Sequence, residues 1–116
     1  MNFHSIKKIK YWIQASRIET LPLSISGIIL GSFFAFYNYS FDKVIFILSI
    51  ITAISFQILS NFANDYGDGV LGTDNNRIGP KRVIASGKLT LKELKKGIIV
   101  NVFVSITFSY TLIKYS

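Results

Sequence analysis

Charged residues are distributed unevenly along this chain, and their distribution limits the folds open to it. No charged residue occurs in residues 20–41, 44–64 or 97–113. Each stretch approaches the roughly 20 apolar residues that an α-helix needs to cross the hydrocarbon core of a bilayer. We therefore predict an all-α fold, a multi-pass membrane helical bundle. The predicted helices of this single membrane domain, residues 1–116, cover about 20–40, 43–64 and 90–115.

Composition agrees with a membrane environment. Half of the residues are hydrophobic, and the mean hydropathy is +0.43. A soluble fold would need polar segments large enough to cover three apolar helices, and only residues 1–20 and 61–96 offer them. The lipid bilayer is therefore the first expected partner.

Basic residues gather at the ends of the apolar stretches. The first 20 residues hold four Lys or Arg against one Glu, and residues 61–96 hold seven against four acids. The positive-inside rule then predicts a cytoplasmic N-terminus and a cytoplasmic loop at about 65–89. Topology thus accounts for the net charge of +7 without nucleic acid as a partner. A cleaved signal peptide also begins with lysines, but the apolar stretch here is long and lacks a clear A-x-A site.

The second apolar stretch ends in a cluster of polar residues. Asn61, Asn64, Asp65 and Asp68 are spaced i, i+3, i+4 and i+7, so they share one face if the helix continues. Carboxylate and amide oxygens suit Mg²⁺, which completes its coordination with water and substrate phosphate. With no cysteine and one histidine in the chain, zinc is not favoured. The simpler alternative is that these residues only solvate a helix end.

The following segment adds charges of both signs between glycines that are expected to end the helix after about Asp68. It contains Asp74, Arg77, Lys81 and Arg82. Arg and Lys side chains are donors for phosphate oxygens, so the segment is suited to a metal-bridged diphosphate. The register of a calcium-binding loop is absent. Further on, Thr90-Leu-Lys-Glu93 fits a capping box and predicts the start of the third helix.

The run from Asn64 to Arg82, NDYGDGVLGTDNNRIGPKR, resembles the first aspartate-rich motif of the UbiA-type membrane prenyltransferases. It looks most like the branch that prenylates 1,4-dihydroxy-2-naphthoate. The segment Arg17-Ile-Glu-Thr-Leu-Pro22 is also similar to the first helix of that family. The broad family pattern has a third acid four residues after Asp68, where this chain has Gly72. The naphthoate branch tolerates this departure, which favours it over the 4-hydroxybenzoate and haem relatives.

The resemblance implies a reaction and a set of site residues. A polyprenyl diphosphate donor and 1,4-dihydroxy-2-naphthoate would give demethylmenaquinone, carbon dioxide and diphosphate, with Mg²⁺ as cofactor. Asp65 and Asp68 are the expected catalytic residues and, with Asn64, the metal ligands. Arg17 is a possible contact of the aromatic substrate. The expected diphosphate-binding residues are Asn61, Asp74, Arg77, Lys81 and Arg82.

The same resemblance implies a longer protein in the bacterial cytoplasmic (inner) membrane. Members of the superfamily have about nine membrane helices and a second aspartate-rich motif, which this chain lacks. We therefore expect an N-terminal portion that is inactive without its C-terminal helices. Two alternatives are another UbiA-type aromatic prenyltransferase and a non-enzymatic small membrane subunit. A subunit that only binds lipid would have no use for the carboxylates of Asp65, Asp68 and Asp74.

Overall fold

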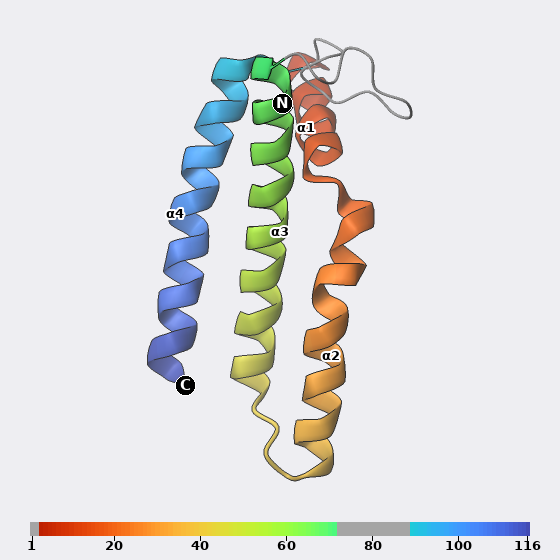
Figure 1. The fold of residues 1–116 in the computed structure, drawn as a ribbon, viewed down its shortest axis with the longest axis vertical. Helices are drawn as coiled ribbons and strands as arrows, with labels where there is room; N and C mark the ends of the chain where they lie inside the picture. The colour runs from red at the N-terminus through yellow and green to blue at the C-terminus, as the bar shows by residue number, and fades with distance from the viewer. Residues whose placement is uncertain (1–2, 72–88) are drawn as a thin grey trace.

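The computed structural model describes residues 3–71 and 89–116. Within these ranges the chain is helical and contains no strand, which confirms the all-α prediction. α2, α3 and α4 run side by side, with α3 in the middle (Figure 1). The elements are α1 (Phe3–Ser16), the 3-10 turn η1 (Ile18–Thr20), α2 (Leu21–Tyr37), α3 (Lys43–Leu71) and α4 (Leu91–Tyr115).

Three segments are long and apolar enough to cross a membrane: Ile6–Tyr37, Lys43–Leu71 and Leu91–Tyr115. Their apolar side chains mostly point outward; Leu23 is 82% exposed and Phe103 is 68% exposed. In water such exposure would be costly, whereas lipid chains solvate these side chains. The surface of the described residues therefore supports the predicted multi-pass membrane bundle.

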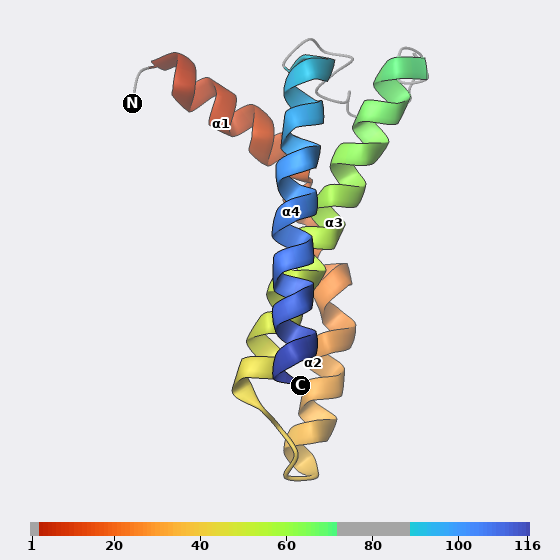
Figure 2. The ribbon, with the colours of Figure 1, turned by 90° about the vertical axis from the view of Figure 1, so that its left-hand side faces the viewer.

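The N-terminal residues form a separate helix. α1 ends at Ser16, and Arg17 takes a left-handed backbone conformation with φ 51° and ψ 65°. Pro22 follows in the first turn of α2, where its missing N–H leaves no intrahelical hydrogen bond unmade. As a result α1 leaves the direction of α2 and projects sideways from the bundle (Figure 2).

α3 is longer than the apolar pattern predicted. It ends at Leu71, beyond both the end predicted at about residue 64 and the glycines expected to end the helix after about Asp68. Gly67 and Gly69 each weaken a helix by only about 1 kcal/mol relative to alanine, and no proline interrupts the hydrogen bonds here. The extension places Asp65 and Asp68 on a regular helix.

α1, α3 and α4 meet in a small apolar core near the end of the bundle where α4 begins. Its buried residues are Ala15, Phe62, Leu89 and Leu94. The ring of Trp12 packs edge-on against Phe62, with 5.5 Å between the ring centroids. This core fixes the end of α3 that carries the predicted site.

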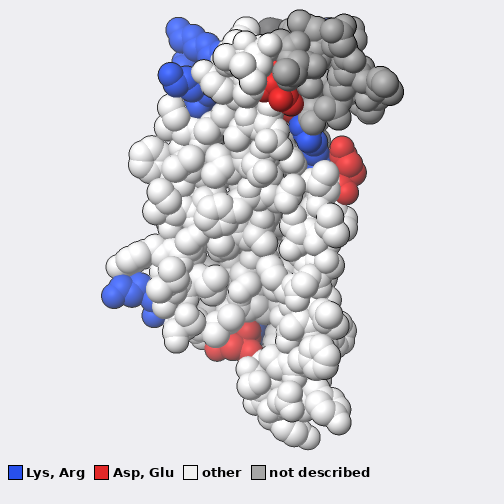
Figure 3. All heavy atoms as spheres, in the orientation of Figure 1, with Lys and Arg blue, Asp and Glu red and all other residues white. Residues whose placement is uncertain are grey.

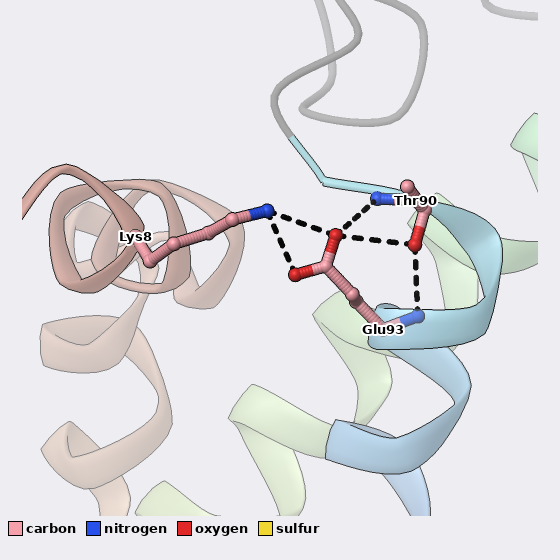
Figure 4. A network of polar contacts seen from close by, with 3 residues as sticks. All are labelled: Lys8, Thr90 and Glu93. Atoms are coloured by element: carbon pink, nitrogen blue, oxygen red, sulfur yellow. Dashed lines mark hydrogen bonds and ion pairs between the residues drawn. The ribbon is translucent and has the colours of Figure 1, made fainter. Parts of the chain in front are cut away.

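The predicted capping box at the start of α4 is confirmed. The Glu93 N–H donates to Thr90 Oγ1 over 3.1 Å, and the Thr90 N–H donates to Glu93 Oε1 over 3.2 Å. Lys8 on α1 donates to the same carboxylate, with 2.7 Å from Nζ to Oε2 (Figure 4). The cap of α4 therefore also ties α1 to the bundle.

Gly97 makes a close helix contact that can be tested. A Cβ added at Gly97 would come within 2.5 Å of two ring carbons of Trp12. Since the indole is held against Phe62, we expect Gly97→Ala to destabilise this chain by about 1–3 kcal/mol through overpacking. Gly31→Ala is the matched control, because nothing lies within 4 Å of a Cβ built there. Thermal unfolding in detergent checks this, and equal midpoints for the two variants would contradict the close contact.

Candidate functional site

Asp65 is buried and forms an ion pair with Arg17. The Arg17 Nη2 donates to Asp65 Oδ1 over 2.5 Å, and Asp65 is only 1% exposed. The guanidinium comes from the left-handed turn between α1 and α2, while the carboxylate comes from the polar end of α3. Burial of an ionised carboxylate is costly unless a charged or hydrogen-bonding partner accompanies it. Arg17 supplies that partner here.

Asn61, one helical turn before Asp65, holds the turn that carries Arg17. Its Nδ2 donates to the Ser16 carbonyl oxygen over 2.9 Å and to Thr20 Oγ1 over 3.1 Å. Thr20 Oγ1 in turn donates to the Arg17 carbonyl oxygen over 2.8 Å. Asn61 is 3% exposed, so it is part of the interior. Its observed contacts fix the backbone on both sides of Arg17.

Gln57 is a third polar residue on this side of α3, and it was not among the site residues predicted from the sequence. Gln57 donates from Nε2 to Asn61 Oδ1 over 3.4 Å and accepts a hydrogen bond from Ser24 Oγ over 2.6 Å. The spacing i, i+4 and i+8 places Gln57, Asn61 and Asp65 along one side of α3. A polar side chain in this register within an apolar stretch was the signal that could have identified Gln57.

The remaining predicted residues divide into two groups. On α3, Asn64 is exposed and Asp68 is half-buried, one turn beyond Asp65. Asp74, Arg77, Lys81 and Arg82 lie outside the described residues. The structure therefore brings together Arg17, Asn61 and Asp65. The predicted binding of diphosphate or aromatic substrate by any of these residues stays a prediction.

The donor chemistry of this end of α3 fits Mg²⁺. Asp65 and Asp68 are three residues apart on one helix, a spacing that puts Cβ atoms about 5–6 Å from each other. One or two carboxylates, with water and phosphate completing the shell, are typical of Mg²⁺ sites. Among residues 3–71 and 89–116, no three acidic, histidine or cysteine side chains converge as a candidate metal site. Any Mg²⁺ site built on Asp65 and Asp68 would therefore be completed by amide oxygens, water, substrate phosphate or residues outside these ranges.

Taken together, the apolar helices and the carboxylates define a multi-pass membrane protein with a polar site at one end of its helices. The chain belongs to the UbiA prenyltransferase family, whose family model matches residues 24–115. This match confirms the family resemblance drawn from the aspartate-rich motif.

Curated relatives carry a more specific name. The chain is 42% identical over 103 residues to the 1,4-dihydroxy-2-naphthoate octaprenyltransferase of Escherichia coli (strain K12), covering 88% of this chain and 33% of the relative. It is also 42% identical over 102 residues to the enzyme of that name from Haemophilus influenzae, covering 85% of this chain and 33% of the relative. The chain thus spans about one third of the length of these relatives. No solved structure matches the chain significantly.

Proposed function

We propose that this chain is part of a membrane enzyme that transfers a polyprenyl group to 1,4-dihydroxy-2-naphthoate. The reaction would release diphosphate and carbon dioxide and yield demethylmenaquinone, a step of menaquinone biosynthesis. The observation that carries the proposal is the pair of carboxylates, Asp65 and Asp68, on one helix at the end of an apolar bundle. Membership of the prenyltransferase family and the activity for which the curated relatives are named support the same reaction.

In this proposal Asp65 and Asp68, with Asn64, hold Mg²⁺ against the diphosphate of the donor. Bound Mg²⁺ would neutralise negative charge on the departing diphosphate. Arg17 and Asn61 act on the protein side by holding the Asp65 carboxylate and the backbone around it. The apolar helices provide a surface for the prenyl chain and exclude water from its reactive end. The proposed diphosphate contacts are Asp74, Arg77, Lys81 and Arg82; Asn61, expected from the sequence to be another, is buried and its amide group is bonded to Ser16, Thr20 and Gln57.

The proposed setting is the bacterial cytoplasmic (inner) membrane, with the N-terminus and the segment after α3 in the cytoplasm. Four Lys or Arg among the first 20 residues and seven in residues 61–96 support this orientation under the positive-inside rule. Because the chain spans about one third of its relatives, we propose that activity requires the C-terminal helices of the same enzyme and that this portion alone is inactive.

A transfer assay with the full-length protein tests the proposal. Membranes containing the protein are supplied with a polyprenyl diphosphate and either 1,4-dihydroxy-2-naphthoate or 4-hydroxybenzoate, with Mg²⁺ or with EDTA. We expect prenylated product from the naphthoate only, and none with EDTA. Product from 4-hydroxybenzoate would instead assign another aromatic prenyltransferase. Absence of product from correctly inserted protein would favour a non-enzymatic membrane subunit.

A further inference from the structure

α1 carries an apolar strip that neither α3 nor α4 covers. Ile6, Ile9 and Ile13 follow one another at i, i+3 and i+7, which places them along one side of the helix. Their exposed fractions are 42%, 46% and 49%. Elsewhere on the same helix, Ala15 is buried and Trp12 packs on Phe62. We call the three exposed residues the isoleucine strip.

The direction of α1 keeps this strip from crossing the bilayer with α2. A helix from Phe3 to Ser16 has 14 residues, and at about 1.5 Å per residue it is too short to span roughly 30 Å of hydrocarbon. It also projects sideways from the bundle (Figure 2). The ion pair between Lys8 and Glu93 holds it to the beginning of α4 (Figure 4). α1 is therefore held beside the beginning of α4, while its N-terminal end points away from the bundle.

Exposed lysines surround that end of the bundle. Lys7 and Lys10 lie on α1 away from its packed side, and three further lysines lie in the first turns of α4. Figure 3 shows Lys and Arg side chains gathered where α4 begins, above a face that is uncharged over most of its length. The exposed lysines in these first turns are Lys92, Lys95 and Lys96.

We propose that α1 is an interfacial helix that binds an anionic phospholipid surface. The isoleucine strip enters the boundary between headgroups and acyl chains, while Lys7 and Lys10 contact anionic headgroups. A helix with lysines on one side and large apolar residues on another is suited to this position. Lys92, Lys95 and Lys96 mark the same membrane level, because the uncharged part of α4 begins just beyond them. This inference concerns lipid binding and does not depend on the proposed reaction.

Fluorescent labelling tests the position of the strip. This chain has no cysteine. In full-length protein whose cysteines outside this chain are replaced by serine, Ile9→Cys and Gln14→Cys therefore each provide a single labelling site. Each variant of the full-length protein is labelled with an environment-sensitive dye in nanodiscs of phosphatidylcholine and phosphatidylglycerol. We expect blue-shifted emission at position 9 that is quenched by doxyl-labelled lipids, and water-like emission at position 14. Water-like emission at position 9 overturns the proposal, as does blue-shifted emission without lipid quenching, which would show that protein covers the strip.

The preference for anionic lipid is tested with the same label. At equal mole fraction, doxyl-phosphatidylglycerol should quench the dye at position 9 more than doxyl-phosphatidylcholine does. Each lysine near an anionic surface contributes up to about fivefold to such a preference, so Lys7→Gln with Lys10→Gln should remove most of it. Lys43→Gln, at the opposite end of the bundle, is the matched control and should leave it unchanged. If the two lipids quench the dye equally in the protein that keeps Lys7 and Lys10, the proposed contact of these lysines with anionic headgroups is wrong.

Discussion

Replacing Arg17 by alanine is expected to destabilise this chain by about 3–5 kcal/mol, because the buried carboxylate of Asp65 loses its ion pair with the guanidinium of Arg17. The carboxylate is 1% exposed, so water cannot readily take the place of the guanidinium. Alanine would also keep the left-handed backbone of residue 17, which is unfavourable for residues other than glycine, without the ion pair that offsets it. Thermal unfolding in detergent measures the loss.

Two further variants separate the ion pair from other effects of the substitution. Arg17→Lys keeps the charge but loses the planar fork of donors, so its unfolding midpoint should fall between those of the wild type and Arg17→Ala. In Arg17→Ala with Asp65→Asn, removal of the buried charge should recover part of the stability lost in Arg17→Ala alone. The comparison also needs Asp65→Asn alone. If the stability losses of Arg17→Ala and Asp65→Asn add up to the loss in the double variant, the contact between Arg17 and Asp65 does not stabilise the fold.

The helical framework could be predicted because its signals are local. Uncharged stretches of membrane-spanning length identified the three long helices, and the spacing of Thr90 and Glu93 identified the cap of α4. The end of α3 was predicted less well. The end of an apolar stretch indicates where a helix passes from lipid into a polar environment, and the helix itself can continue beyond that point. Backbone hydrogen bonds continue through Gly67 and Gly69 to Leu71.

The partners within the site could not be predicted because they depend on tertiary packing. Arg17 and Asp65 are 48 residues apart, and they meet only because α1 turns away from α2 at a left-handed residue. No periodic pattern of apolar and polar residues in the sequence predicts that turn. The sequence indicated that Asn61 and Asp65 share a helix side, but not that this side faces the α1–α2 junction. The spacing of polar residues in one membrane helix therefore predicts which of them share a side. Their hydrogen-bonding partners can be identified only once the position of the neighbouring helix is known.

Asp68→Asn in the full-length protein is expected to lower the rate of prenyl transfer by roughly 100-fold or more, with little change in the unfolding midpoint. Asp68 is half-buried near the end of α3, so loss of its charge should affect the proposed metal site more than the fold. Asp65→Asn should lower both the rate of prenyl transfer and the unfolding midpoint, because Asp65 also pairs with Arg17. Initial rates of product formation over a range of Mg²⁺ concentrations, measured beside thermal unfolding, distinguish the two carboxylates.

The matched control for this prediction is Glu19→Gln, which removes an exposed carboxylate from the same end of the bundle. If net charge near the membrane surface governed the rate, Glu19→Gln and Asp68→Asn would slow transfer equally. If Asp68 holds the metal, only Asp68→Asn should raise the Mg²⁺ concentration needed for half-maximal rate. Asp68→Asn with an unchanged rate and unchanged Mg²⁺ dependence would remove Asp68 from the proposed site.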